Sequence, residues 1–344
     1  MLTLALAIST RALSTPRVLV YTATAGYRHD SIPTAIQVLG EQASSYNVSF
    51  VFSEDPNMFT NATLAGFDGV MFVLNSDEVL NLTGQAALQT YFQSGGVYTG
   101  VHSGSACLFD DTNYQQAIFG NEALFDYHPQ LQSATFVRLN DTHPATVNLP
   151  DRWTYDEEVY YFRSDPRSAG AVALVTVDET SYVDNGTTSG NYPTQGTPHP
   201  IAWYIESPES AQPLLPSVTK AGRSFYTALG HLNTTWQNET FMEHVMSGLV
   251  WALEGASTKA YGVGLVGNED SSTPPNSSTT SHSTSSTSNS VPTAQGGAGG
   301  SATSTAASAS SSKGGGLARA DGTGGIASAV IGVALVGVGV RVLL

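Results

Sequence analysis

Residues 95–104, GGVYTGVHSG, decide the fold class of this chain. The glycine pair closes a predicted helix, and the apolar run 97–101 is typical of a strand buried in a parallel sheet. His102 follows directly, where the chain of an α/β protein turns sharply and offers a side chain to the ligand crevice. The stretch therefore predicts a parallel strand with a functional side chain at its carboxyl end.

The sequence before this stretch repeats the same alternation of strand and helix. Apolar strands are predicted over 17–21, 48–52 and 69–74, with helices beginning after residues 30–31 and spanning 83–94. This spacing is typical of a parallel sheet with helices on both faces. The polar loops after the strands should then meet at one edge of the sheet.

The sequence after this stretch is richer in strands. Strands are predicted over 133–139, 159–162, 171–177, 201–204 and 224–229, and a closing helix over 241–253. No internal repeat or linker is evident before about residue 255, so we expect one α/β domain over residues 15–256.

Composition excludes several classes of protein. The net charge is −15 with 13 Lys and Arg, which argues against a nucleic-acid partner, because phosphate binding needs clustered cations. The single cysteine, Cys107, excludes an intrachain disulfide framework. No Walker loop and no GxGxxG follows a predicted strand, so no nucleotide cofactor is expected.

Both ends of the chain predict an extracellular, surface-anchored protein. Residues 1–14 are typical of a short secretory signal peptide, the alternative being an apolar strand extension. Residues 257–313 include a Ser/Thr-rich run expected to form a disordered, O-glycosylated stalk. Residues 314–344 combine small residues, a spacer and an apolar tail, which favours a GPI-attachment signal at Gly314 or Ser310 over a spanning helix. The lipid anchor would tie the protein to the plasma membrane or cell wall.

Eight N-x-Ser/Thr sequons support passage through the secretory pathway. They lie at Asn47, Asn61, Asn81, Asn140, Asn185, Asn233, Asn238 and Asn276.

Histidines are the main candidates for chemistry. Five of the eight lie at predicted strand ends or in adjoining loops: His29, His102, His128, His199 and His231. Imidazole suits metal ligation or proton transfer near neutral pH, although each histidine could instead hydrogen-bond a loop carbonyl. We expect His29, His102, His199 and His231 to hold a divalent metal.

The segment DEEVYYF, residues 156–162, supplies the acidic candidate. Neighbouring strand residues point to opposite faces, so only one of Glu157 and Glu158 should face the crevice. Glu158 would share a face with Tyr160 and is the better candidate. Cys107 lies five residues after the turn at His102, so we expect a buried structural thiol rather than a nucleophile.

Six blocks together resemble the ThuA-like (trehalose-utilisation) family. They are residues 23–33 (ATAGYRHDSIP), 95–104, 142–153 (THPATVNLPDRW), 156–162, 199–204 (HPIAWY) and 222–231 (GRSFYTALGH). The resemblance covers residues 17–253 and implies a class I glutamine-amidotransferase-like fold, a flavodoxin-like α/β/α sandwich with a mostly parallel sheet. The nucleophilic cysteine of such amidotransferases is replaced here by His102, which argues against glutaminase activity.

The resemblance also implies a role in disaccharide or keto-sugar metabolism. His29, His102, Glu158, His199 and His231 match recurrent polar positions of the family. We expect His102, Glu158 and His29 to be catalytic. His128, Tyr160 and Trp203 are expected to bind substrate, the two aromatic residues by stacking on a sugar face.

Three functions remain open from the sequence. The first is a metal-assisted sugar isomerase or hydrolase, the second a non-catalytic glycan-binding module, and the third a structural adhesin. In all three, the protein would act outside the cell, on a carbohydrate or through a contact at the cell surface.

Overall fold

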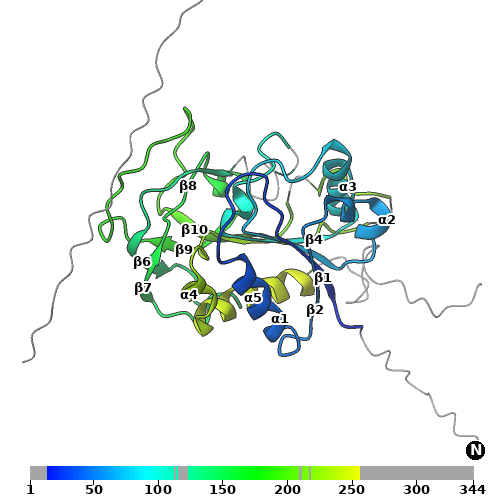
Figure 1. The fold of residues 1–344 in the computed structure, drawn as a ribbon, viewed down its shortest axis with the longest axis horizontal. Helices are drawn as coiled ribbons and strands as arrows, with labels where there is room; N and C mark the ends of the chain where they lie inside the picture. The colour runs from blue at the N-terminus through cyan, green and yellow to red at the C-terminus, as the bar shows by residue number, and fades with distance from the viewer. Residues whose placement is uncertain (1–13, 112–113, 115–122, 209–210, 217, 256–344) are drawn as a thin grey trace, which may run out of the picture. The chain divides into compact units, whose positions relative to one another are not determined.

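A nine-stranded sheet, in the order β2-β1-β3-β4-β11-β10-β9-β6-β7, forms the centre of the computed structural model (Figure 1). The structure describes residues 14–111, 114, 123–208, 211–216 and 218–255. One half of the sheet consists of β2 (Ser49–Ser53), β1 (Arg17–Tyr21), β3 (Gly69–Val73), β4 (Val97–Val101) and β11 (Ser224–Thr227). These neighbours all pair in parallel, in the strand order of flavodoxin-like sheets.

The other half of the sheet extends it with antiparallel strands. These are β10 (Pro200–Ile205), β9 (Val172–Val177), β6 (Gln132–Arg138) and β7 (Arg152–Glu157). A separate two-stranded ribbon pairs β5 (Phe125–Tyr127) with β8 (Tyr161–Phe162). The ribbon lies close to the end of the sheet that carries the candidate site.

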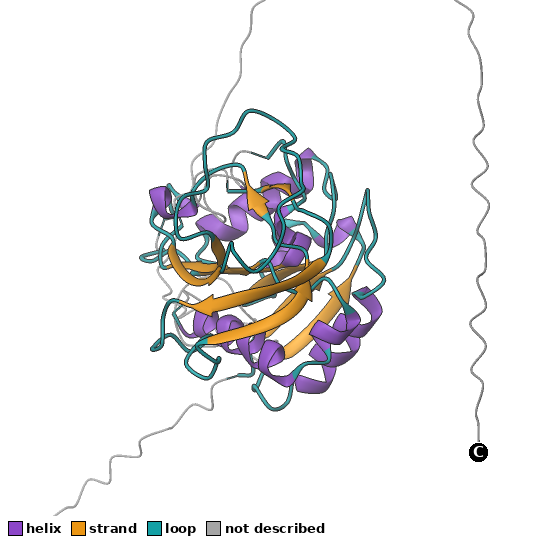
Figure 2. Cartoon of the chain, turned by 90° about the vertical axis from the view of Figure 1, so that its left-hand side faces the viewer, coloured by secondary structure: helices purple, strands orange, loops and turns teal. Residues whose placement is uncertain are grey.

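Helices cover both faces of the sheet, which confirms the predicted α/β sandwich. They are α1 (Ile32–Gln42), α2 (Asn61–Leu64), α3 (Leu82–Gln93), α4 (Asn233–Trp236) and α5 (Glu239–Glu254). Helices α1, α4 and α5 lie on one face, and α2 and α3 lie on the other (Figure 1). Figure 2 shows the helices on either side of the strands after a turn of 90°.

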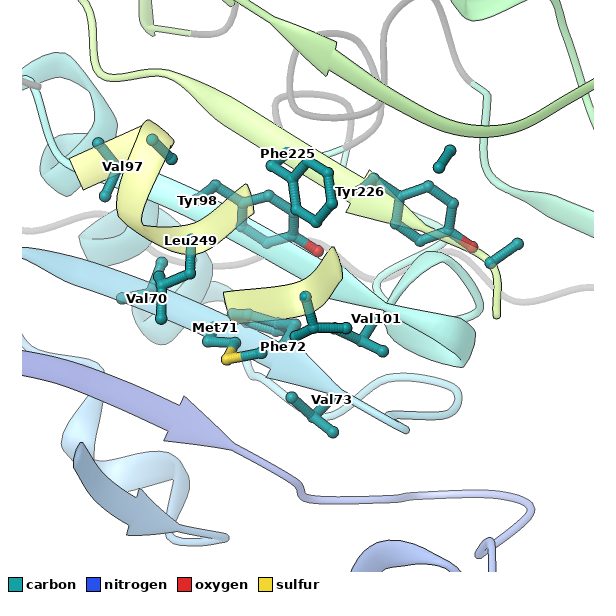
Figure 3. Packing of buried hydrophobic residues seen from close by; sticks show 14 of the residues in the cluster. Val70, Met71, Phe72, Val73, Val97, Tyr98, Val101, Phe225, Tyr226 and Leu249 are labelled. Carbon is teal, nitrogen blue, oxygen red and sulfur yellow. The ribbon is translucent and has the colours of Figure 1, made fainter. Parts of the chain in front are cut away.

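The core lies between the parallel strands and their covering helices. The ring of Tyr98 contacts Phe92 of α3, whereas Phe225 points to the other face of the sheet, towards α5. Figure 3 shows Val70, Tyr98 and Phe225 of three neighbouring strands together with Leu249 of α5. All four are at most 1% exposed, and each such side chain contributes roughly 1.5–3 kcal/mol of hydrophobic stabilisation. The core strands β3 and β4 are buried along their whole length, as expected for strands covered on both faces.

The predicted elements agree best with the structure in the parallel half. Strand β4 has the predicted bounds, and Leu88 and Phe92 are buried as expected. Helix α1 begins at Ile32 with a proline in its first turn, but the Ser31 side chain forms no capping hydrogen bond. In the antiparallel half, strand β7 was not predicted, and the strand predicted over 159–162 is reduced to β8.

Several predictions concern residues outside the described ranges. These are the signal peptide apart from Ser14, the stalk, the anchor region with Ser310 and Gly314, and the sequon at Asn276. Within the described ranges, no helix has the length and apolar character needed to cross a bilayer.

Candidate functional site

Three histidines and one glutamate meet at the carboxyl ends of the parallel strands. His29 lies in the loop after β1, His102 directly follows β4, and His231 follows β11. Glu158 comes from the link between β7 and β8. One ligand atom from each residue lies within 4.8 Å of the others, so this group, the His/Glu cluster, could hold a metal ion.

His102 occupies a constrained position at the centre of the cluster. Its φ of 54° lies in the left-handed region, which is unusual for a residue with a side chain and costs of order 1–3 kcal/mol. Its Nδ1 lies 2.7 Å from the carbonyl oxygen of Ala228 and therefore carries the proton in that hydrogen bond. Nε2 is therefore the unprotonated nitrogen and faces the cluster, so it could ligate a metal ion once the ion replaces its present hydrogen-bond donor, the Tyr160 hydroxyl.

Glu158 links the histidines through both carboxylate oxygens. Oε2 lies 3.1 Å from Nδ1 of His231 and 3.5 Å from Nε2 of His102, whereas Oε1 lies 3.5 Å from Nε2 of His128. Burial alone would raise the pKa of Glu158, but its close contacts with His102 and His231 and the charge of His128 hold it well below its usual range. The residue is therefore a carboxylate at neutral pH.

The two other histidines of the cluster differ in their electrostatics. Burial, followed by the charges of His102 and His231, lowers the pKa of His29 to about 2, so its imidazole is neutral. Burial also acts to lower the pKa of His231, but the hydrogen bond and charge of Glu158 outweigh it and raise that pKa. Neutral imidazole and carboxylate are the forms that bind divalent metals, and the donor set fits an ion such as Zn²⁺.

Glu157 stabilises the backbone beside the cluster through hydrogen bonds. Its fully buried carboxylate accepts hydrogen bonds from the backbone N–H of Gly230, at 2.9 Å, and of His231, at 3.2 Å. The Thr235 hydroxyl donates to it at 2.9 Å. The expectation that the two glutamates begin one strand is wrong, because β7 ends at Glu157 and the chain leaves the sheet at Glu158.

Tyr160 closes the inner side of the cluster. Its hydroxyl lies 2.9 Å from Nε2 of His102 and donates to that atom, because Nδ1 of the same ring holds the proton. Burial raises the pKa of this phenol well above its ordinary value, so the proton is retained.

The family model for trehalose utilisation, ThuA, matches residues 17–252, which include every residue of the cluster. The chain belongs to the ThuA family.

A ThuA-like protein of Bacteroides uniformis is 16% identical, with a TM-score of 0.50 over 72% of this chain and 95% of its own. One from Parabacteroides merdae is 15% identical, with a TM-score of 0.48 over 70% of this chain and 90% of its own. At this identity the likeness concerns the fold alone. No curated protein matches the chain significantly.

Two predicted substrate-binding aromatics are buried in the ThuA domain. Trp203 is 0% exposed and packs with Phe162 and Tyr226 at centroid distances of 5.0 and 4.5 Å. It is a core residue and presents no face to a sugar, because Phe162 of the β5–β8 ribbon and Tyr226 of β11 pack against its ring. Tyr160 is 2% exposed, so its hydroxyl, not its ring face, is placed for chemistry.

His199 lies apart from the His/Glu cluster of the ThuA domain. Its Nε2 donates to the carbonyl oxygen of Tyr160 at 2.7 Å, and its Nδ1 faces Glu179 at 3.5 Å. The prediction that His199 ligates the same ion does not fit this geometry. His128 is closer to the expected role, since its side chain is 33% exposed and faces Glu158.

The loop after β1 contains a residue that the sequence analysis missed. Tyr27 is 65% exposed, and its ring lies edge-on to His29 with centroids 4.8 Å apart. Ser76 donates to the Tyr27 carbonyl oxygen at 2.7 Å, and Arg28 pairs with Glu54, which fixes the loop. The signal was present in the sequence as an aromatic residue two positions before His29 in a loop at a strand end.

Cys107 is fully buried, as expected for a structural thiol. Burial raises the pKa of this thiol, and its sulfur lies 3.4 Å from the Gly104 carbonyl oxygen. A thiol nucleophile would need a lowered pKa and access to solvent.

The described sequon asparagines divide into two groups. Asn47, Asn61, Asn81 and Asn185 are exposed, and Asn140, Asn233 and Asn238 are partly buried. Asn238 caps α5 by accepting from the Phe241 N–H and also accepts from the Tyr155 hydroxyl.

Proposed function

We propose that this ThuA domain is a metal-dependent enzyme that acts on a disaccharide or keto-sugar through isomerase or hydrolase chemistry. The supporting observation is the convergence of His29, His102, Glu158 and His231, whose ligand atoms lie within 4.8 Å of one another. The family's description, trehalose utilisation, supports a sugar substrate.

A divalent ion held by the His/Glu cluster would polarise a sugar carbonyl or lower the pKa of a water molecule. The protein prepares this site through its own hydrogen bonds. Ala228 fixes the tautomer of His102, and Glu157 fixes the backbone of His231. Such supporting contacts orient ligands and typically change metal affinity or activity 10–100-fold.

Two side chains beside the cluster, Tyr160 and His128, would transfer protons during the reaction. The Tyr160 side chain offers a protonated hydroxyl, and the His128 side chain, 33% exposed, can be reached by substrate. A keto-sugar isomerisation needs a proton removed from carbon and one delivered to oxygen, and hydrolysis also needs a base and an acid. His128 and Tyr160 would divide these tasks.

The substrate would be met outside the cell. The signal peptide over residues 1–14, the stalk over 257–313 and the anchor at Gly314 or Ser310 are sequence patterns that support secretion and lipid anchoring. The sequons at exposed asparagines agree with the same route.

Metal content of the purified full-length protein, measured by elemental analysis, tests the proposal. We expect about one divalent ion per chain in the wild type, and its loss in His102→Ala and Glu158→Gln. The matched control is His143→Gln, a histidine outside the cluster, which should retain the metal. Turnover of a panel of disaccharides and keto-sugars should disappear in the same two variants. No metal in the wild type after zinc or manganese addition, together with unchanged turnover in the variants, would contradict the proposal.

A second candidate is a non-catalytic glycan-binding module. The exposed ring of Tyr27 beside His29 favours this candidate, because a sugar face can stack on it without any metal. Binding of a glycan to the metal-free protein, without product formation by the metal-loaded protein, would support it over the enzyme.

A further inference from the structure

A hollow lies against the β5–β8 ribbon, and no residue of the His/Glu cluster lines it. Its volume is about 480 Å³, within the range of roughly 300–1,000 Å³ typical of small-ligand sites. Tyr127 and Tyr161 of the ribbon form one wall, and residues 188–197 of the following loop form the other.

The loop that encloses this hollow is long and well fixed. Residues 178–199 contain no helix or strand, and loops of this length in compact domains usually have a function. Asp126 accepts hydrogen bonds from the Thr188 hydroxyl at 2.7 Å and from the Ser189 N–H at 2.9 Å. Gln195 accepts from the Phe162 N–H at 2.9 Å. The walls are therefore formed in advance, which reduces the entropic cost of binding.

The lining chemistry favours a neutral ligand rich in hydroxyl groups. Asn191, Thr194 and Thr197 contribute amide and hydroxyl groups, and the carboxylate of Glu179 accepts hydrogen bonds. The residues lining the hollow include no lysine or arginine, which disfavours an anionic ligand. Tyr192, 39% exposed, has the Arg163 guanidinium over its ring, 5.0 Å from the centroid, and its remaining exposed surface can meet the apolar face of such a ligand.

A buried histidine adds a second observation. Nδ1 of His199 is buried without a hydrogen-bond partner among the described residues, and it faces Oε1 of Glu179 at 3.5 Å. Because Nε2 of this ring holds the proton donated to Tyr160, Nδ1 and the carboxylate are both acceptors. Two facing acceptors repel unless a donor satisfies them, and of the two only Glu179 lines the hollow, where it can accept from a ligand hydroxyl.

We propose that this hollow is a carbohydrate-binding site, distinct from the His/Glu cluster, that holds one neutral sugar unit against Glu179, Asn191 and Tyr192. Consecutive residues serve the two sites, because the Tyr160 hydroxyl contacts His102 and the Tyr161 ring lines the hollow. The site would hold a glycan beside the reaction centre, and it does not depend on the metal chemistry proposed above.

Ligand-detected NMR and calorimetric titration of the full-length protein test the site. The probes are trehalose, maltose, cellobiose and chitobiose at millimolar concentration. We expect binding of at least one of them, weakened at least fivefold in Glu179→Gln and in Asn191→Ala. His102→Ala should bind this sugar as the wild type does, and Glu41→Gln, an exposed carboxylate on α1, is the matched surface control. All variants are compared by thermal unfolding.

Three results would overturn the proposal. The first is sugar binding that is lost in His102→Ala but retained in Glu179→Gln and Asn191→Ala. The second is no binding of any of the four sugars. The third is binding of a divalent cation at the hollow, seen in the wild type and lost in Glu179→Gln. The first result leaves the proposed metal-dependent function intact. Loss of metal and turnover in His102→Ala with sugar still bound would leave both proposals standing.

Discussion

The hydroxyl of Tyr160 lies 2.9 Å from Nε2 of His102, the unprotonated nitrogen of that ring, which faces the cluster. Tyr160→Phe removes the proton donor and leaves the ring packing in place. We expect turnover of the sugar substrate to fall about 100-fold, the scale of general acid catalysis, with a smaller change in KM. Steady-state kinetics and metal content check this, and unchanged turnover would exclude Tyr160 from proton transfer.

Glu157→Gln tests the buried support of the cluster. The amide would place an N–H₂ group among three donors, those of Gly230, His231 and Thr235. An unsatisfied buried group costs about 1–3 kcal/mol, so the unfolding temperature should fall. Metal affinity should also fall because the His231 backbone loses its partner. Denaturant unfolding and metal titration measure the two effects, and a variant with wild-type values of both would rule out the supporting role.

Tyr27→Ala tests the exposed ring at the mouth of the cluster. Since the side chain is 65% exposed, we expect no loss of stability. Loss of stacking of about 1 kcal/mol would raise KM roughly fivefold at constant kcat. Tyr27→Phe is the control and should retain the wild-type KM. An equal rise in both variants would point to the hydroxyl instead of the ring.

The buried histidines His244 and His143 should make the folded protein less stable in acid. Burial lowers the pKa of each to about 4, whereas an unfolded histidine titrates near 6.5. As pH falls through 6.5, the unfolded chain binds protons that the folded chain does not, so the free energy of unfolding decreases until about pH 4.

The contribution of His244 is about 3 kcal/mol over this window, from a shift of about 2.5 pH units. Denaturant unfolding at pH 7.5 and 4.5 should show a smaller acid loss in His244→Gln, which can still donate to the Ala145 carbonyl oxygen. An identical acid loss in the variant and the wild type would refute this assignment.

Cys107 should be inert in the folded protein. Its side chain is 0% exposed and burial raises the pKa of the thiol, so thiolate-selective reagents should not modify it at pH 8. Full reaction is expected after unfolding in guanidinium chloride. Reaction of the native protein at the rate of a free thiol would show that the site opens.

The sequence determined the parallel half of the fold and most of the cluster. Short apolar runs such as 97–101 indicate burial on both faces, and their alternation with helices favours a parallel sheet covered on both sides. Parallel strands end at one edge of their sheet, so residues following β1, β4 and β11 had to meet. The rule predicts that His29 and His102 lie together, whereas the place of His231 follows from the parallel pairing of β11 with β4, and His199 lies outside the cluster.

The tertiary structure alone decided the antiparallel half and the roles within it. Trp203 is a core residue because Phe162, from the separate β5–β8 ribbon, packs against its ring, a contact that the local sequence pattern does not predict. Strand β7 ends between Glu157 and Glu158, so these side chains need not point to opposite faces as they would in a continuous strand. As a result, Glu158 belongs to the cluster, and Glu157 accepts hydrogen bonds from the backbone that carries His231. The hollow beside the ribbon exists because the loop over residues 178–199 packs against the ribbon. The path of this loop is set by contacts between residues distant in sequence, such as Asp126 with Ser189, and not by local pattern.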